Sequence, residues 1–193
     1  SALELPVPHV FARGSDDRFR GNLDTAKLAA LLAGEDAGQV GFIYIEAENN
    51  AAGGYPMSMA NLREVHALAR AHQITMVLDA TRLVENAVLI QRYEPGFREV
   101  PLGDIVREFA GHFDAMAMSL AKDFGITRGG LIATNDERLF HRIRDVVAFF
   151  GAGVNVTDKA MFNAAMQGFD FVLEHVTRRV DQARPLPAMH APE

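Results

Sequence analysis

Apolar residues follow two alternating patterns along the chain. Short apolar runs alternate with longer segments in which apolar positions recur every three or four residues. The short runs predict buried strands, and the longer segments predict helices that pack by one face. Asp24 or Thr25 is predicted to cap the first helix, and Ser58 the second. The predicted strands cover residues 39–46, 74–79, 115–119 and 130–134, and the predicted helices cover 25–34, 59–72, 83–92, 102–110, 136–150 and 158–184.

The alternation of strands and helices predicts an α/β fold. Strand–helix–strand units place successive strands in parallel, so we expect a mostly parallel sheet with helices on both faces. The chain shows no internal repeat and no low-complexity linker. Residues 1–193 are therefore predicted to form one α/β domain, with irregular, proline-bearing ends at 1–21 and 185–193.

Composition narrows the classes of function. The chain has 193 residues, a formal net charge of −6 and no cysteine. Without cysteine there is no disulfide, zinc–thiolate site or thiol nucleophile, and the lack of an HxxxH pair argues against a structural metal site. The acidic balance argues against a nucleic-acid partner. No apolar run is long enough for a membrane span and no signal peptide is visible, so we expect a soluble, cytoplasmic domain.

Polar and charged side chains follow three of the predicted strands. They lie in the short segments 46–54, 79–82 and 119–130, each directly after an apolar run. The carboxyl ends of parallel strands meet at one edge of the sheet, where ligands bind in folds of this class. We therefore expect the functional site to be formed by these three segments.

Asp79 and Arg82 each allow two interpretations. Asp79 ends a predicted strand and can cap the following helix, or it can be a carboxylate that keeps the pyridine nitrogen of a cofactor protonated. Arg82 can be a surface cation, or it can hydrogen-bond an anionic oxygen on the same ligand.

Lys122 lies in a glycine-containing loop just after a predicted buried strand. A desolvated lysine loses its proton more readily and can act as a nucleophilic amine, whereas an exposed one would pair with Asp123. Ser119 can donate a hydrogen bond to a phosphate, and Asn50 can bind a ligand oxygen or belong to a plain turn. The sequence contains no GxxxxGK[ST], GxGxxG or GxSxG motif, so nucleotide-binding and serine-hydrolase functions have no support.

Six short motifs occur in a fixed order along the middle of the chain. They are NxAGG, SMAN, DATR, VEN, SxxKD and GG, and they are concentrated in Asn50–Ala87 and Met118–Asp136. Together they resemble the tryptophanase and tyrosine phenol-lyase family of β-eliminating lyases, from about Phe19 to about Arg184. These lyases use pyridoxal 5′-phosphate on the fold of aspartate aminotransferase (fold type I), so the resemblance implies that the chain is part of the large domain of that fold.

The resemblance implies a role for each candidate site residue. Lys122 would form the Schiff base with the cofactor and remove the α-proton of an amino-acid substrate. Asp79 would pair with the pyridinium nitrogen, and Asn50 and Arg82 would hydrogen-bond the phenolic oxygen. Ser119 would contact the phosphate.

The chain departs from the family pattern at several positions. Leu120 and Ala121 stand where the family has a glycine and a second lysine, which removes a positive charge near the phosphate. Thr127 and Arg128 stand where the family has Asn-Ile, close to a backbone potassium contact, which argues against activation by potassium. The stretch FFGAGVNVTDKAM is shorter than the family's glycine-rich loop and lacks its Arg-Asp pair.

Relative to the family, the chain lacks the segments that carry the main phosphate-binding loop, the aromatic residue that stacks on the cofactor and the arginine that binds the substrate carboxylate. We therefore expect one chain of a split lyase, completed by a complementary chain in a hetero- or homo-oligomer. A non-catalytic scaffold or regulatory homologue, and a fragment of a full-length lyase, are the alternatives.

Overall fold

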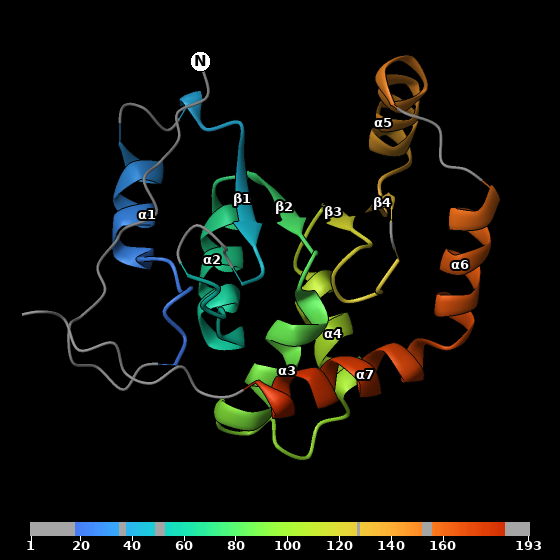
Figure 1. The fold of residues 1–193 in the computed structure, drawn as a ribbon. Helices are drawn as coiled ribbons and strands as arrows, with labels where there is room; N and C mark the ends of the chain where they lie inside the picture. The colour runs from blue at the N-terminus through green and yellow to red at the C-terminus, as the bar shows by residue number, and fades with distance from the viewer. Residues whose placement is uncertain (1–17, 35–37, 49–52, 127, 152–155, 184–193) are drawn as a thin grey trace, which may run out of the picture.

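The computed structural model describes residues 18–34, 38–48, 53–126, 128–151 and 156–183 (Figure 1). Within these residues, four strands form one sheet in the order β1-β2-β3-β4. The strands are β1 (Phe42–Glu46), β2 (Thr75–Asp79), β3 (Ala115–Ser119) and β4 (Gly130–Thr134). The helices are α1 (Thr25–Ala33), α2 (Met59–Ala71), α3 (Leu83–Tyr93), α4 (Leu102–Gly111), α5 (Glu137–Phe150), α6 (Val156–Gln167) and α7 (Phe169–Gln182).

The sheet is mostly parallel, as predicted. Strands β1, β2 and β3 run parallel, and helices connect them. Strand β4 runs antiparallel to β3 because a loop, rather than a crossover helix, joins the two. The sheet is mixed because the long connections that contain helices join parallel strands, whereas the short loop joins antiparallel ones.

One face of the sheet carries the core. Side chains alternate between the two faces of a strand, and this places Ile43, Ile45, Met76 and Leu78 on the same face. All four are buried, in one cluster with apolar residues of α1, α2, α3 and α4, for example Leu62. The apolar stripes of these helices therefore meet the sheet on this side, as their periodicity predicts.

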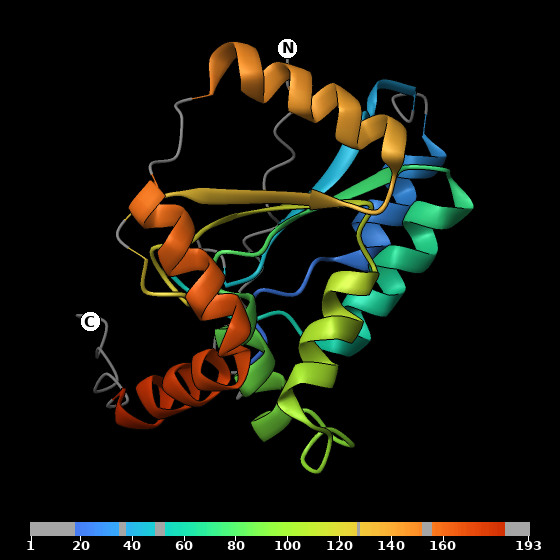
Figure 2. The ribbon, with the colours of Figure 1, turned by 90° about the vertical axis from the view of Figure 1, so that its right-hand side faces the viewer.

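The opposite face is largely open. Phe42, Tyr44 and Ile132 share this face by register, and they are 58%, 53% and 48% exposed. Helix α5 lies on the other side of the sheet from α2 and α4 (Figure 2), and none of its residues is buried. Helices thus lie on both sides of the sheet, as expected, but only one side is tightly packed.

Two predicted helix starts are confirmed and one predicted helix is wrong. Asp24 accepts a hydrogen bond from the backbone N–H of Lys27, and Ser58 accepts one from that of Asn61, so both are N-caps. The single helix predicted for 158–184 is two helices, α6 and α7, which meet at Gly168. Glycine is costly inside a helix, and the chain turns there. Among the described residues, every helix is too short or too polar to span a membrane.

Candidate functional site

The carboxyl ends of β1, β2 and β3 lie side by side, as predicted. In the register, Glu46 is opposite Asp79, and Asp79 is opposite Ala117. The ladder continues beyond the strands, because the N–H of Ala47 donates to the carbonyl of Asp79 (3.1 Å) and that of Ala80 to the carbonyl of Ala117 (2.8 Å). Asp79 and Ser119 therefore end neighbouring strands at the same edge of the sheet.

Asp79 uses both carboxylate oxygens at the end of β2. Oδ1 accepts a hydrogen bond from the N–H of Thr81 at 2.9 Å, and Oδ2 accepts one from the hydroxyl of Tyr44 at 2.9 Å. Asp79 does not cap α3, whose N-cap is Arg82 and has no side-chain cap. The capping interpretation is therefore wrong, and Asp79 is a half-buried carboxylate at the carboxyl edge of the sheet.

Tyr44 was not singled out from the sequence. It lies on the same face of the sheet as Asp79, because Glu46 faces Asp79 in the register and Tyr44 is two residues earlier on β1. Partial burial, with the residue still 53% exposed, and the hydrogen bond to Asp79 raise the pKa of Tyr44 to about 12. Tyr44 is therefore a protonated hydrogen-bond donor to Asp79 at neutral pH. The period-2 alternation of FIYIE was the available signal.

Arg82 stands at the start of α3 and is half-buried. Its Nη1 lies 3.1 Å from Oε2 of Glu85, one turn further along the helix. Its Nε is buried and has no partner among the described residues. Arg82 is thus held from one end by Glu85 while one N–H donor stays free.

Glu48 is a second buried group without a partner. It follows β1, is 3% exposed, and has a left-handed backbone (φ 58°) that few residues other than glycine adopt. Its Oε1 has no partner among the described residues. Burial, reinforced by the charges of Glu85 and Asp123, raises the pKa of Glu48 to about 9, although Arg82 and Arg179 lower it. Glu48 is therefore a neutral acid at pH 7.

Ser119 ends β3, and Lys122 lies in the loop between β3 and β4. The Lys122 side chain is exposed, and its carbonyl accepts a hydrogen bond from the N–H of Gly125 (3.2 Å), which closes a tight turn. Gly125 has a φ of 63°, a conformation that suits glycine. The N–H of Ser119 donates to Oγ1 of Thr81 (3.0 Å), so Thr81 ties the end of β3 to the segment after Asp79.

The structure meets neither interpretation of Lys122, because its side chain is exposed rather than desolvated and Asp123 does not pair with it. The Asp123 side chain is fully buried; Oδ2 accepts from the N–H of Val84 (2.9 Å) and Oδ1 from Nη2 of Arg179 (2.9 Å). Asp123 thus binds the N-terminus of α3, a position that favours a negative charge. Burial raises the pKa of Asp123, whereas the hydrogen bonds from Arg179 and Val84 lower it.

Asn50 lies outside the described residues, as does Thr127. The four other predicted site residues all lie at or just beyond the carboxyl edge of the sheet: Asp79, Arg82, Ser119 and Lys122. Sequence reasoning missed the roles of Tyr44, Glu48, Glu85, Asp123 and Arg179. The described residues contain no group of three or more His, Asp or Glu side chains arranged to hold a metal ion.

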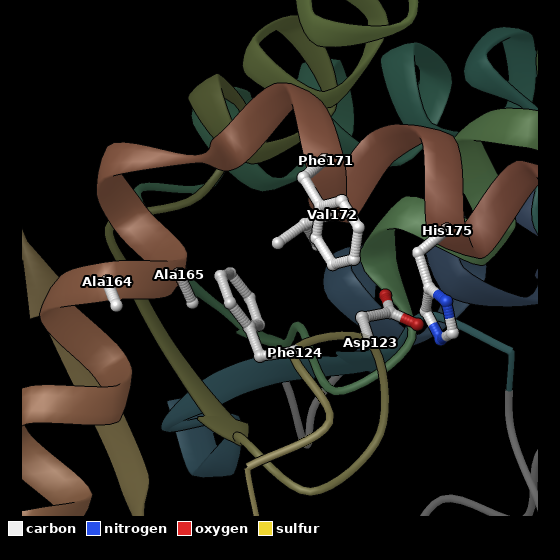
Figure 3. A pocket seen from close by; sticks show the side chains of 7 residues that line it. All are labelled: Asp123, Phe124, Ala164, Ala165, Phe171, Val172 and His175. Carbon is white, nitrogen blue, oxygen red and sulfur yellow. The ribbon is translucent and has the colours of Figure 1, made fainter.

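A cavity of about 270 Å³ adjoins the loop on the side of α7. Figure 3 shows Phe171, Val172 and His175 projecting from α7 toward Asp123 and Phe124 of the loop. The lining of the cavity is mostly apolar and includes none of the predicted site residues. The predicted site is therefore the open edge of the sheet rather than this cavity.

Comparison with known proteins gives one family. Residues 5–189 match the family described as "Beta-eliminating lyase". The chain is 41% identical over 132 residues to the tyrosine phenol-lyase of Symbiobacterium sp. (strain SC-1). The matched stretch covers 68% of this chain and 29% of that protein. It is 34% identical over 144 residues to the tryptophanase of Salinibacter ruber, which covers 75% of this chain and 30% of that protein. The chain spans about 30% of the length of these relatives.

Solved structures agree on the fold. The PLP-bound C–S lyase from Staphylococcus hominis superposes with a TM-score of 0.54 at 14% identity, over 83% of this chain and 37% of that one. At this identity the likeness shows the fold alone. It confirms the prediction of a fold type I arrangement around a mostly parallel sheet.

Proposed function

Because this chain belongs to the β-eliminating lyase family, we propose that it supplies the cofactor base of a pyridoxal-phosphate-dependent lyase that acts on an amino acid. The observation that carries the proposal is the grouping of Asp79, Arg82, Ser119 and Lys122 at one sheet edge. These residue types can hold a ring nitrogen, a phenolic oxygen, a phosphate and an aldehyde. The relatives act on tyrosine and tryptophan by name, and the substrate proposed for this chain is an amino acid with a leaving group on Cβ.

The residues present fit this cofactor. Arg82 keeps a buried, unpartnered Nε, which suits an anionic oxygen. Asp79 binds Tyr44 and Thr81, yet a carboxylate has about four acceptor positions and can still accept a ring N–H. Lys122 makes no side-chain hydrogen bond or ion pair with the described residues, so its amine is available.

In the proposed enzyme each residue has a defined task. Lys122 would hold the cofactor at its aldehyde and would take the α-proton of the substrate at Nζ. Asp79 would keep the ring nitrogen protonated, and Arg82, with Asn50, would hold the phenolic oxygen. Ser119 would bind the phosphate. When bound, the cofactor supplies an electron sink for the pair released at the α-carbon.

We further propose that a complementary chain completes the site. The sheet face that carries Tyr44 and Asp79 is open in the described structure, with Phe42 58% exposed beside them. A cofactor held on this face alone would stay in water, where its charged contacts are weak. A second chain over this face would exclude that water and add the remaining cofactor and substrate contacts.

The test is to co-express the chain with the reading frames that neighbour its gene and to add pyridoxal phosphate. The wild-type assembly is expected to bind the cofactor and turn yellow, and Lys159→Ala, an exposed lysine on α6, is expected to behave in the same way. Lys122→Ala should stay colourless after removal of free cofactor. A yellow Lys122→Ala assembly would reject Lys122, and a colourless wild-type assembly would favour a non-catalytic homologue.

A further inference from the structure

We infer that Arg179 is a positioning residue for Lys122, an inference that rests on the proposed function of that lysine. Arg179 lies on α7, more than fifty residues after Lys122. Its Nη2 is 2.9 Å from Oδ1 of Asp123 and 2.7 Å from Oε2 of Glu85, and its Nη1 is 3.4 Å from the carbonyl of Lys122. One guanidinium therefore contacts the backbone of Lys122, its sequence neighbour and the first turn of α3.

These contacts form a chain that joins two predicted site residues. Arg82 pairs with Glu85, Glu85 with Arg179, and Arg179 with Asp123 and Lys122. The chain links the proposed phenolic-oxygen ligand to the proposed aldehyde-binding lysine. The distance between the two residues is consequently set through α7, and not only through the sheet.

Asp123 makes the connection rigid at the loop. Its other oxygen accepts from the N–H of Val84, so the carboxylate bridges the start of α3 and Arg179. The side chain of Asp123 is 0% exposed and that of Glu85 is 20% exposed. The loop at Lys122 and Asp123 is thereby held by both α3 and α7, while the Lys122 side chain itself stays exposed.

Packing of α7 does not need this network. Val172 and Val176 of α7 are buried against Val84 and Val88 of α3, and this apolar contact fixes the helix. A buried ion pair contributes little net stability, because removing the charges from water offsets their attraction. What such a pair does specify is geometry, and here that geometry includes the backbone of Lys122.

Arginine is required for this arrangement. Its planar fork carries five N–H donors and can reach two carboxylates and a carbonyl at once. A lysine ammonium at the same position keeps the charge but is a point donor on a flexible stem. Arg179→Lys therefore keeps the positive charge near Asp123 and Glu85 but removes the simultaneous contacts of the guanidinium.

The experiment measures how readily Lys122 traps the cofactor aldehyde. The co-expressed assembly is treated with pyridoxal phosphate and borohydride, and the labelled lysines are quantified by peptide mass spectrometry. The three lysines of the chain are Lys27, Lys122 and Lys159, all exposed, so Lys27 and Lys159 are internal standards. Arg178→Ala is the matched control, since the neighbouring Arg178 is exposed and pairs only with Glu174 among the described residues.

In the wild type and in Arg178→Ala, Lys122 is expected to carry most of the label. In Arg179→Ala and Arg179→Lys, the label on Lys122 should fall by roughly tenfold or more while that on the two standards stays constant. Circular dichroism shows whether each variant is folded. If Arg179→Ala does not fold, Arg179→Lys alone provides the test. Wild-type labelling in a folded Arg179→Lys would overturn the inference. Equal labelling of all three lysines in the wild type would instead reject the proposed function.

Discussion

The hydroxyl of Tyr44 donates a hydrogen bond to Oδ2 of Asp79 over 2.9 Å. The two residues come from neighbouring parallel strands, 35 positions apart, and meet on the open face of the sheet. Because Thr81 donates to the other oxygen, the Asp79 carboxylate is oriented from both sides. A carboxylate fixed in this way is ready to accept a third donor without losing rotational freedom at that moment.

Tyr44 is expected to ionise at a higher pH than an ordinary tyrosine. Its pKa of about 12 means that the folded state holds this proton more tightly than the unfolded state, so folding stability falls as pH rises from 10 toward 12. The chain has three tyrosines and no tryptophan, which makes the ultraviolet absorbance of tyrosinate easy to follow. Titration of folded wild type should show one late component.

Tyr44→Phe should remove that late component, and Tyr93→Phe, which replaces an exposed tyrosine, should leave it in place. Circular dichroism at each pH shows whether the chain is still folded. If Tyr44 of the folded chain titrated near pH 10, the hydrogen bond to Asp79 would have no measurable strength.

Asp79→Ala should reduce catalysis much more than stability. The change removes two hydrogen bonds at a half-buried position, which costs roughly 2 kcal/mol of unfolding free energy. In the proposed enzyme it also removes the group that keeps the ring nitrogen protonated, so turnover should fall by several orders of magnitude. The measurement pairs melting temperature with turnover in the co-expressed assembly.

Asp136→Ala is the matched control for this change. Asp136 caps α5 by accepting from the N–H of Leu139 (2.8 Å), and it follows the end of β4 that lies opposite the edge with the predicted site. Its loss should lower stability by about 1 kcal/mol and leave turnover unchanged. Normal turnover in Asp79→Ala would reject the role of Asp79.

The fold could be predicted because it depends on local patterns. Apolar residues alternate with others or follow one another in FIYIE and TMVLD, which is the pattern of buried strands. Ser58 precedes a segment whose apolar residues recur at helical spacing. The break between α6 and α7 was missed although Gly168 marks it, because the apolar positions on either side continue at helical spacing. A single glycine is compatible with a helix, so tertiary packing decides whether the helix continues through it or ends.

The site was predictable in part for a similar reason. Asp79 and Lys122 became candidates because Asp79 ends an apolar strand and Lys122 lies in the loop that follows one. The partner of Asp123 was not found because Arg179 lies 56 residues away on another helix, and no local pattern connects them. Asn86, in the VEN motif, has a fully buried side chain that accepts from the N–H of Met57 and donates to its carbonyl, a structural contact that no local pattern predicts.

Glu48 should make the stability of the protein depend on pH. Its pKa rises from 4.5 to about 9 on folding, so the folded state binds a proton that the unfolded state has lost. Stability therefore falls as pH rises from about 4.5 to about 9, by up to roughly 1.4 kcal/mol per pH unit. Glu48→Gln, which keeps the shape and removes the charge, should be more stable than wild type at pH 8 and equal to it near pH 4.5.

Denaturant unfolding at a series of pH values measures this difference. Glu174→Gln is the control, because Glu174 is exposed on α7 and its charge costs little. The curves of wild type and Glu174→Gln should run parallel, whereas that of Glu48→Gln should diverge upward with pH. If Glu48→Gln also ran parallel to wild type, Glu48 would be charged in the folded protein.

Helix α5 is expected to form part of an interface between chains. Phe149 and Phe150 are 87% and 85% exposed, and Val146 on the same helix is 59% exposed. Together with the exposed face of β1, they leave more apolar surface in water than isolated side chains on a monomer account for. We expect an obligate oligomer whose interface includes α5, is apolar and buries more than roughly 2,000 Å² in total, as obligate interfaces do. Because no residue of α5 is buried within the chain, Phe149→Asp should leave folding intact and dissociate the assembly.

Sedimentation and light scattering measure the assembly directly, and the control is Phe171→Ser, which replaces an exposed phenylalanine on α7 outside this surface. Wild type and Phe171→Ser should sediment as oligomers, and Phe149→Asp should sediment as a smaller, folded species. If α5 were in contact with water only, a charge introduced at Phe149 would not change the sedimentation. An effect seen in Phe149→Asp and not in Phe171→Ser therefore assigns the interface to α5. A monodisperse wild-type monomer of 21.1 kDa would contradict the prediction, and the open face of the sheet would then have to bind its cofactor in water.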